Sequence, residues 1–482
     1  MTPSVDALRE RLAAYDQEHV LRHWDDLSGD ARENFAGQIA AIDLPLMERL
    51  VNTWVRKDPP PEVFDRIDPV PTIPVADAAR KDAQEAWDAG EAALRSGRVG
   101  MLLVAGGQGT RLGYDGPKGA YPVGPITGRS LFAYHADKIL HAQRKYGCVL
   151  PWYIMVSDTN REETRAFFKE NEFFGLRETD VYFFTQRMVP CVDDRGKFML
   201  DEPGNLAMNP NGHGGVIPAV VENGMADDAK QRGVDTLSYF QVDNWALKVA
   251  DPYFIGYHIL GKGQMSSKIH RKTEVRESVG VHCLCDGEYR TIEYSELDIY
   301  PQLLETDAEG HPVYYAGNPA IHMISVGFIE DVFSRFESFP WHRAHKKIPY
   351  INESGERVEP EKPNGYKFET FVFDALRFTG HEPIALEIDR AGEYTPIKQF
   401  SGANSVEAAR ESQAELWARW LEAAGYAVSR DADGNVAIQI EISPQFAFSQ
   451  QEFVERARNL NLKLDADLAI GPDGEVIAKH SG

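Results

Sequence analysis

The residues best suited to chemistry lie in one glycine-rich segment that runs from Val104 to Lys118. Gly106 and Gly107 follow an apolar run directly, and glycines there let backbone N–H groups approach a phosphate or a base closely, which a Cβ would hinder. Arg111 supplies a planar donor fork for phosphate oxygens, and Lys118 supplies a compact positive charge. The segment therefore predicts a loop that binds a nucleotide.

Other interpretations of this loop explain less. It lacks the Gly-Lys-Ser/Thr ending of a P-loop, and its spacing is not the G-x-G-x-x-G of a dinucleotide fold. A glycine turn that only packs a strand against a helix leaves Arg111 and Lys118 unexplained. We therefore expect a phosphate-binding role.

Alternating elements must position this loop. Apolar runs predict strands, which are separated by helices with cap signals such as Asn160 with Glu163, the pattern of a capping box. This alternation predicts an α/β fold with a doubly wound, mostly parallel sheet, in which ligands bind beyond the carboxyl ends of the strands. Four of those ends are polar or small: Gly106, Ser157, Gln186 and Asp243. The predicted strands are 99–105, 152–156, 181–185 and 237–242, and the predicted helices are 130–146, 160–175 and 218–233.

Two further regions flank this core. Residues 4–55 show the spacing of a helical pair, a proline-rich extended connector covers 57–74, and a helix is expected over 76–96. A long helix over 406–425 and short strands over 436–442 indicate a small C-terminal lobe. We predict a helical region with its connector at 1–95, a main domain that carries the nucleotide-binding loop at 96–387 and the C-terminal lobe at 388–482.

The composition excludes several classes of function. Lys and Arg number 51 against 74 Asp and Glu, and the resulting net charge of −23 opposes binding to nucleic acid or an anionic membrane. No run of 18 apolar residues occurs, and the first thirty residues lack a signal-like hydrophobic centre, so we expect a cytoplasmic protein. The sequence leaves open whether the chain forms a homo-oligomer.

Cysteines and paired histidines offer weaker signals. Four cysteines, with a single C-x-C, favour buried free thiols over a zinc site. His342-x-x-His345 has a spacing found in metal pairs but lacks nearby acidic or cysteine partners in the sequence, which favours surface or packing histidines. The aromatic runs, such as Phe167-Phe168, are typical of a core rather than of nucleic-acid stacking.

The glycine-rich segment with Pro117-Lys118 resembles the signature of UDP-sugar pyrophosphorylases, and the nearest likeness is to eukaryotic-type UDP-N-acetylhexosamine pyrophosphorylases. The resemblance runs from about residue 99 to about 400, and more loosely beyond. Its further blocks are 152–155, 212–215, 242–244, 293–296, 316–318, 362–365 and 395–398. Seven blocks in order are not a chance match. The resemblance implies a uridylyltransferase that forms a UDP-sugar and pyrophosphate from UTP and a sugar 1-phosphate.

The resemblance also implies roles for individual residues. For UTP, it assigns the uridine site to the backbone of Ala105, Gly106 and Gly107, and the uracil to Gln186 and Gly212. Arg111 and Lys118 would contact the triphosphate, Lys367 would contact a phosphate of UTP, and Lys398 would contact the incoming sugar phosphate. Arg111, Lys118 and Lys398 would be catalytic. Asp243 matches an acidic position beside the phosphates and is the candidate ligand of the cofactor Mg²⁺, a cation that carboxylates suit.

For the sugar, the resemblance points to Glu293, Tyr294 and Asn318. One position departs from the pattern: His213 stands where the acetamido-sugar enzymes carry Asn, and a Gly-His-Gly turn is similar to that of UDP-glucose pyrophosphorylases. The blocks around the sugar favour N-acetylglucosamine 1-phosphate, whereas His213 favours glucose 1-phosphate, and an enzyme of broad sugar specificity is a further alternative. Two other functions stay open, a UDP-sugar-binding regulator without turnover and a glycosyltransferase, although Val242-Asp243-Asn244 carries only one of the two acids of a D-x-D motif.

Overall fold

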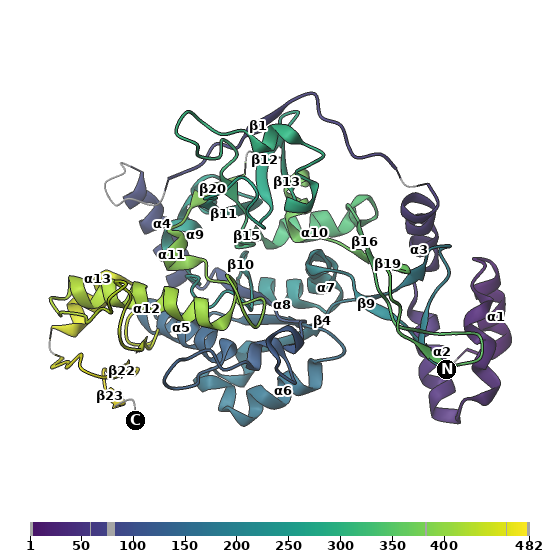
Figure 1. The fold of residues 1–482 in the computed structure, drawn as a ribbon, viewed down its shortest axis with the longest axis horizontal. Coiled ribbons are helices and arrows are strands. Elements are labelled where there is room, and N and C mark those ends of the chain that lie inside the picture. The colour runs from purple at the N-terminus through teal and green to yellow at the C-terminus, as the bar shows by residue number, and fades with distance from the viewer. Residues whose placement is uncertain (1–2, 58, 75–81, 381–382, 459, 480–482) are drawn as a thin grey trace. The chain divides into compact units, whose positions relative to one another are not determined.

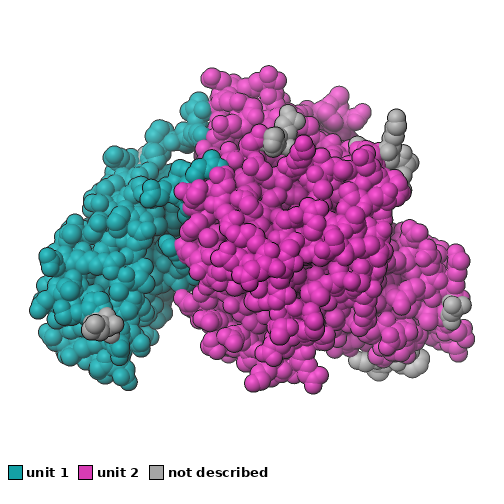
Figure 2. All heavy atoms as spheres, turned by 180° about the vertical axis from the view of Figure 1, so that it is seen from behind, with its two compact units in different colours: residues 1–63, 186–216, 335–374 teal, residues 64–185, 217–334, 375–482 magenta. Residues whose placement is uncertain are grey.

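A computed structural model describes residues 3–57, 59–74, 82–380, 383–458 and 460–479. The chain forms two compact units, which Figure 2 colours teal and magenta. Unit 1 comprises Met1–Val63, Gln186–Val216 and Arg335–Asp374, and unit 2 comprises Phe64–Thr185, Ile217–Ser334 and Ala375–Gly482. The boundaries of these two units differ from those of the three predicted regions. The three regions stay a prediction about which parts of the chain fold separately.

The centre of unit 2 is the predicted parallel sheet. Its four parallel strands lie in the order β10-β2-β3-β4, so the alternating β and α pattern is confirmed. All four carboxyl ends therefore lie at one edge. Figure 1 labels β10 and β4. The strands are β2 (Val99–Val104), β3 (Trp152–Val156), β4 (Val181–Thr185) and β10 (Thr236–Gln241).

The sheet continues past β10 with antiparallel strands that the sequence analysis did not assign. Their order is β10-β15-β11-β14-β12-β1, with β13 paired to β12 and β20 parallel to β11. The predicted extended connector supplies β1, which is extended because it pairs with β12. The bounds are β1 (Ile67–Pro69), β11 (Met265–Arg271), β12 (Val281–Cys285), β13 (Glu288–Ile292), β14 (Ala316–Gly317), β15 (His322–Ser325) and β20 (Ala385–Glu387).

Helix α5 (Leu131–Tyr146) follows the prediction closely. The Ser130 hydroxyl accepts a hydrogen bond from the Ala133 N–H, and Gly147 ends the helix in the left-handed conformation with φ 66°. The predicted helix at 218–233 is instead two helices, because Gly224 with φ 76° interrupts it. The other helices of this part are α6 (Arg161–Glu170), α7 (Val216–Glu222), α8 (Met225–Gln231) and α10 (Val326–Ser334).

Helices α4 (Ala83–Arg95) and α9 (Pro252–Leu260) pack at very short range. A Cβ on Gly90 would lie 1.9 Å from the Pro252 carbonyl oxygen, and one on Gly256 would lie 1.7 Å from the Ala86 carbonyl oxygen. Both glycines are thus required by backbone contact. The predicted start of α4 at residue 76 lies outside the described residues.

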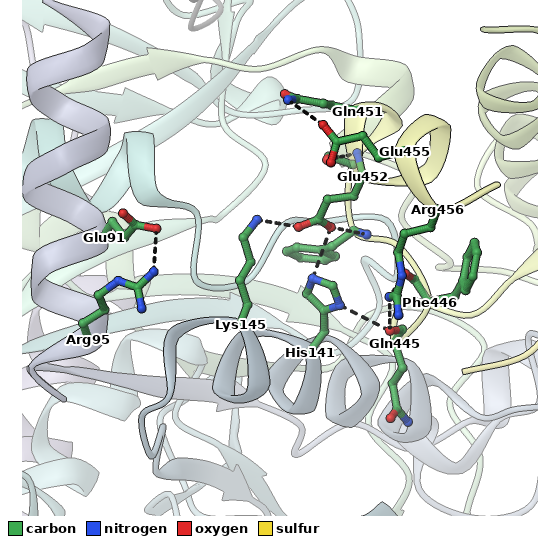
Figure 3. A network of polar contacts seen from close by, with 12 residues as sticks. Glu91, Arg95, His141, Lys145, Gln445, Phe446, Gln451, Glu452, Glu455 and Arg456 are labelled. Atoms are coloured by element: carbon green, nitrogen blue, oxygen red, sulfur yellow. Dashed lines mark hydrogen bonds and ion pairs between the residues drawn. The ribbon is translucent and has the colours of Figure 1, made fainter. Parts of the chain in front are cut away.

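The C-terminal part of unit 2 has a three-stranded sheet in the order β21-β22-β23 and is anchored to α5 by polar contacts. Figure 3 shows Glu452 of α13 between two α5 side chains: its carboxylate lies 3.2 Å from His141 Nε2 and 2.5 Å from Lys145 Nζ. The elements are α11 (Arg390–Glu393), α12 (Val406–Ala423), β21 (Ile440–Ile442), α13 (Gln450–Ala457), β22 (Asp467–Ile470) and β23 (Val476–Lys479).

Unit 1 contains more helix than the predicted pair, because Pro45 and Asp43 start a further helix after α2. Its apolar core joins Leu12, Phe35 and Met47 to Phe198 and Phe368 from the later segments. The elements are α1 (Val5–Ala13), a 3-10 segment (Glu18–Asp26), α2 (Gly29–Ala41), α3 (Leu44–Leu50), β5 (Met188–Pro190), β6 (Val192–Asp193), β7 (Leu200–Glu202), β8 (Asn205–Leu206), β9 (Met208–Pro210), β16 (His342–Lys346), β17 (Tyr350–Ile351), β18 (Arg357–Val358) and β19 (Gly365–Glu369).

Cysteines and aromatic runs take the places expected of them. Cys191, Cys283 and Cys285 are buried free thiols and Cys148 is half-buried. Phe168 is fully buried and its ring contacts Phe132 and Phe183, as a core residue should. Among the helices of the described residues, none combines the length and the apolar character that spanning a membrane requires.

Candidate functional site

The glycine-rich loop begins where β2 ends and closes on itself. Gly109 N–H donates to the Gly116 carbonyl at 2.9 Å, and Lys118 N–H donates to the Gly107 carbonyl at 3.1 Å. These bonds bring Lys118 back beside the start of the loop. Ala105 is buried, whereas Gly106 is half-buried and Gly107 is exposed, so the backbone at the two glycines is open to a ligand.

Asn160 departs from the sequence prediction. Its side chain makes no cap bond to α6, so the predicted capping box with Glu163 is wrong. The amide instead faces the loop: Nδ2 donates to the carbonyls of Ala105 at 2.9 Å and Gly107 at 3.3 Å. Its Oδ1 accepts from the Ser157 N–H at 2.9 Å. The acceptor Oδ1, which a cap would need, is thus occupied by Ser157, and the donor Nδ2 is occupied by the loop carbonyls.

Three of the predicted charged residues meet at the carboxyl end of β10. Lys118 Nζ lies 3.0 Å from Asp243 Oδ2, and the two side chains are only 16% and 13% exposed. Burial alone would raise the pKa of Asp243, but the charges of Lys118 and Lys398 outweigh it and lower that pKa. The carboxylate therefore stays ionised, because the charges of both ammonium groups stabilise it.

Lys398 also remains charged. Burial lowers its pKa, but Tyr394, Asp243, Glu293 and Tyr294 raise it, and the net pKa lies above the ordinary value. The structure thus brings Lys118, Asp243 and Lys398 together with two of the predicted sugar residues.

Side chains of helix α5 hold the backbone next to Asp243. His135 Nε2 donates to the Val242 carbonyl at 3.1 Å, and burial lowers the pKa of His135 to about 3, so the ring is neutral. Lys138 donates to the carbonyls of Trp245 and Leu247, and burial lowers the pKa of its amine to about 7. The backbone on both sides of Asp243 is therefore fixed by one helix.

Asn244 attaches the segment that carries Lys398. Its Nδ2 donates to the Glu393 carbonyl at 2.7 Å, and its Oδ1 accepts from the Thr395 N–H at 3.0 Å. A third bond runs from the Ile397 N–H to the Asp243 carbonyl at 3.0 Å. Asn244 is 2% exposed, so these bonds are shielded from water. The sequence analysis missed this residue as a support, although it directly follows Asp243.

A buried charge network supports the same segment. Lys268 Nζ lies 2.7 Å from Asp251 Oδ2 and 2.5 Å from Glu393 Oε2, and Lys248 Nζ lies 3.3 Å from Glu393 Oε1. Burial opposes the charge on Glu393, but Lys248 and Lys268 more than offset it and lower its pKa to about 2.

The predicted sugar residues lie on two adjoining turns. Glu293 caps the 3-10 turn Tyr294–Glu296 in a capping box, and Tyr294 is half exposed. Asn318 N–H donates to the Gly280 carbonyl at 2.9 Å, and a Cβ on Gly280 would lie 2.9 Å from Glu293 Oε1. Gly280 thus lies beside both Glu293 and Asn318. The spacing of these residues in the sequence does not reveal that they are neighbours.

In unit 1, Gly212 and His213 form a tight turn against the segment after β19. Gly212 has φ 83°, and a Cβ there would lie 2.3 Å from the Thr370 carbonyl oxygen, so only glycine fits. His213 Nδ1 accepts from the Val372 N–H at 3.1 Å. The neutral ring consequently carries its proton on Nε2. Phe371 stacks on His213 at 5.2 Å between ring centroids and Phe373 lies at 5.6 Å, so two aromatic rings flank this imidazole.

The other predicted residues are less enclosed or less connected. Gln186 is buried in unit 1, directly after β4 ends in unit 2. Lys367 lies on β19 near Cys191: burial raises the pKa of that thiol to about 11, and the Lys367 charge opposes the rise. Arg111 is exposed in a 3-10 turn and, within the described ranges, its side chain contacts no partner.

His342 and His345 contact two different carboxylates. His342 Nε2 lies 2.7 Å from Asp374 Oδ2, and His345 Nε2 lies 2.8 Å from Asp194 Oδ1. The rings also stack on Phe371 and Tyr366. Both histidines thus have acidic partners, which the sequence analysis did not find because Asp374 and Asp194 are distant from them in the sequence.

The site combines a glycine loop at a strand end with two lysines and a buried carboxylate, and it lies on a doubly wound sheet. This combination defines the class of α/β proteins that bind nucleotide phosphates. The family described as UTP–glucose-1-phosphate uridylyltransferase matches residues 48–419. The chain belongs to this family, and it is an enzyme of the UDP-sugar pyrophosphorylase class.

Similar proteins cover nearly the whole chain. A UDP-N-acetylhexosamine pyrophosphorylase-like protein 1 of Homo sapiens is 35% identical over 87% of this chain and 85% of its own length. A UDP-N-acetylglucosamine pyrophosphorylase of Saccharomyces cerevisiae is 34% identical over 91% of each chain. The crystal structure of the uridine diphosphate N-acetylglucosamine pyrophosphorylase from Trypanosoma brucei in complex with an inhibitor matches with a TM-score of 0.80 and 25% identity, over 96% of this chain and 98% of that one.

Proposed function

We propose that this uridylyltransferase joins UTP to N-acetylglucosamine 1-phosphate and releases pyrophosphate. The observation that carries the proposal is the charge cluster Lys118–Asp243–Lys398 beside the glycine-rich loop, with Glu293 and Tyr294 near enough to affect the pKa of Lys398. A UDP-sugar-binding regulator has little need for two lysines held charged around one buried carboxylate. The names of the similar proteins support the acetylated sugar.

The reaction follows from these charges. An oxygen of the sugar 1-phosphate attacks the α-phosphorus of UTP, the bond from that phosphorus to the bridging oxygen breaks, and pyrophosphate leaves with the bond electrons. The attacking group is already an anion, so no general base is needed. Lys118 and Arg111 would neutralise the triphosphate and Lys398 the incoming phosphate, which lowers the barrier mainly by positioning and charge stabilisation.

Asp243 suits a magnesium ion. Mg²⁺ binds through one or two carboxylates, substrate phosphates and retained waters, and Asp243 offers one carboxylate that its neighbours keep ionised. When bound there, the ion would neutralise phosphate charge. Among the described residues, one cluster of three metal-capable side chains was found, Asp307, Glu309 and His311; it is exposed and lies far along the chain from these lysines.

As the family resemblance implies, Gln186 and Gly212 would read the uracil, and Lys367 would contact phosphate. An amide can present both a donor and an acceptor to the edge of a base. The acetamido group would meet His213, whose Nε2–H can donate to an acetyl carbonyl while Phe371 and Phe373 provide an apolar wall suited to a methyl group.

His213 itself supports a second candidate, UDP-glucose formation. Pyrophosphate release separates the alternatives when UTP, Mg²⁺ and a panel of sugar 1-phosphates are supplied. N-acetylglucosamine 1-phosphate should give the highest kcat/KM, and CTP or ATP should replace UTP poorly. Release only with glucose 1-phosphate would support the second candidate. Binding of a UDP-sugar without any release would contradict catalysis, and scrambling of pyrophosphate into UTP without a sugar phosphate would contradict direct displacement.

A further inference from the structure

Asn160 is a fully buried amide whose two ends are both engaged. Oδ1 accepts from the Ser157 N–H at 2.9 Å and from the Ser157 hydroxyl at 3.1 Å. Nδ2 donates to the Ala105 and Gly107 carbonyls at 2.9 and 3.3 Å. The side chain therefore connects the end of β3 to the loop that follows β2, and it is not needed for the cap of its own helix.

The geometry of the peptide bond gives this contact a directional consequence. In a trans peptide the C=O and the following N–H point in opposite directions. Because Asn160 holds the carbonyls of Ala105 and Gly107 on its own side of the loop, the N–H groups of Gly106 and Gln108 are directed to the other side. Within the described residues neither of these N–H groups has a protein acceptor.

The second carbonyl also links Asn160 to a charged residue. The Gly107 carbonyl accepts from the Lys118 N–H at 3.1 Å as well as from Asn160. Lys118 in turn lies 3.0 Å from Asp243. One amide thus fixes both the peptide orientation in the loop and the backbone from which Lys118 extends.

We propose that Asn160 is a positioning residue for the nucleotide: it holds the Gly106 and Gln108 N–H groups turned outward, ready to bind an anionic nucleotide before the nucleotide arrives. The inference rests on the proposed function, in which this loop binds UTP. Without Asn160 the two peptides can rotate, so the nucleotide must order them at the cost of affinity. The sugar phosphate does not depend on these peptides.

The test compares binding of the two substrates to full-length Asn160→Ala. Isothermal titration with UTP, with and without Mg²⁺, should show a rise in Kd of about tenfold or more, the scale expected when buried hydrogen bonds are removed. KM for the sugar 1-phosphate should change less than about twofold, since its contacts are untouched. Hydrogen exchange should become faster in a peptide covering 104–118 and stay unchanged in 265–285.

Gln17→Ala is the matched control. Gln17 is also buried, and its amide likewise bonds two backbone groups, the Gly196 carbonyl at 3.0 Å and the Phe198 N–H at 2.9 Å. It should lower the Tm but leave the Kd for UTP unchanged. Asn160→Ser, which keeps a donor, should give an intermediate Kd and serves as the test if Asn160→Ala does not fold.

The possible results separate this inference from the function on which it rests. A wild-type Kd for UTP in folded Asn160 variants overturns the inference, and so does equal weakening of both substrates, which indicates a structural role alone. Failure of wild-type protein to bind UTP overturns both. If wild type binds UTP but transfers no uridylyl group, the proposed function is wrong. The comparison of the Kd for UTP between wild type and the Asn160 variants still decides the inference in that case.

Discussion

At the scale of single residues, the pair formed by Lys118 and Asp243 differs from an exposed ion pair. Both side chains are mostly shielded from water, so their charges act at short range with little solvent screening. The charges of both Lys118 and Lys398 stabilise the ionised carboxylate of Asp243, so one negative charge stays fixed beside the lysines.

Lys118→Ala should lower kcat far more than it lowers stability. The variant removes one positive charge that acts when negative charge develops on the leaving pyrophosphate, and such a loss costs about 3 kcal/mol of transition-state stabilisation. Steady-state pyrophosphate release and a thermal melt check both parts. Lys145→Ala is the control, since it also breaks an ion pair, with Glu452, but lies outside the proposed site. A near-wild-type kcat for Lys118→Ala contradicts the assignment.

His213→Asn should change the choice of sugar rather than the rate with the best sugar. An amide can both donate and accept, whereas the neutral imidazole offers its Nε2–H because Nδ1 accepts from Val372. We expect wild type to favour the acetylated sugar phosphate and the variant to favour it more strongly, by about 1–3 kcal/mol in relative kcat/KM. If wild type prefers glucose 1-phosphate tenfold and the variant moves toward the acetylated sugar, His213 is the selector and the enzyme makes UDP-glucose.

At the scale of elements, the sequence predicted the parallel strands well and the supporting contacts poorly. The apolar runs 152–156 and 181–185 coincide with β3 and β4, because buried parallel strands need continuous apolar residues. Strands such as β14, with two residues, depend on partners distant in the sequence and leave no periodic signal. Asn160 matched a local cap pattern, but its Oδ1 accepts from Ser157 and its Nδ2 donates to the loop after β2, which is distant in the sequence.

The same limit applies to the site. The family resemblance named Lys118, Asp243 and Lys398, and the structure brings them together; their catalytic roles remain predictions. Asn244, Gly280 and Phe371 act only through contacts between distant segments, so neither spacing nor residue type identified them. A polar residue directly after Asp243 was the one available signal.

Asn244→Ala should separate the loop after β10 from the segment that carries Lys398. The change removes bonds to Glu393 and Thr395, and a buried group left unpaired costs about 1–3 kcal/mol. We expect a lower Tm and a fall in kcat larger than any change in KM for UTP, because Lys398 acts on the incoming phosphate. Gln17→Ala, with a similar loss of stability, should keep kcat. Equal kcat in both variants means that this segment does not position Lys398.

At the scale of the whole molecule, acidic residues outnumber basic ones, and part of the acidic charge is held in ion pairs. Unit 2 places carboxylates against buried or half-buried cations, as Glu393 with Lys268 and Glu452 with Lys145 show. Unit 1, assembled from three separated stretches of chain, could not be recognised from sequence order, because its core depends on contacts between those stretches. Because these ion pairs need ionised carboxylates, they make the free energy of unfolding depend on pH.

Glu452→Gln should make the protein less stable at neutral pH and less sensitive to acid. Burial opposes the charge on Glu452, but hydrogen bonds from His141, Lys145 and the Phe448 N–H outweigh it and lower its pKa to about 2. The folded pKa is thus below the unfolded value of about 4.3, so this contribution is fully present above that value and disappears as the pH falls toward 2. Urea unfolding should show a difference in the free energy of unfolding between wild type and variant at pH 7, and this difference should narrow between pH 4.3 and the lowest pH at which the protein folds.

Glu455→Gln is the control. Glu455 is exposed on the same helix and accepts from Gln451 at 3.1 Å, so its loss should leave the free energy of unfolding almost unchanged at every pH (Figure 3). A gap between wild type and Glu452→Gln that stays constant with pH would mean that the side chain stabilises α13 by packing and not by its charge.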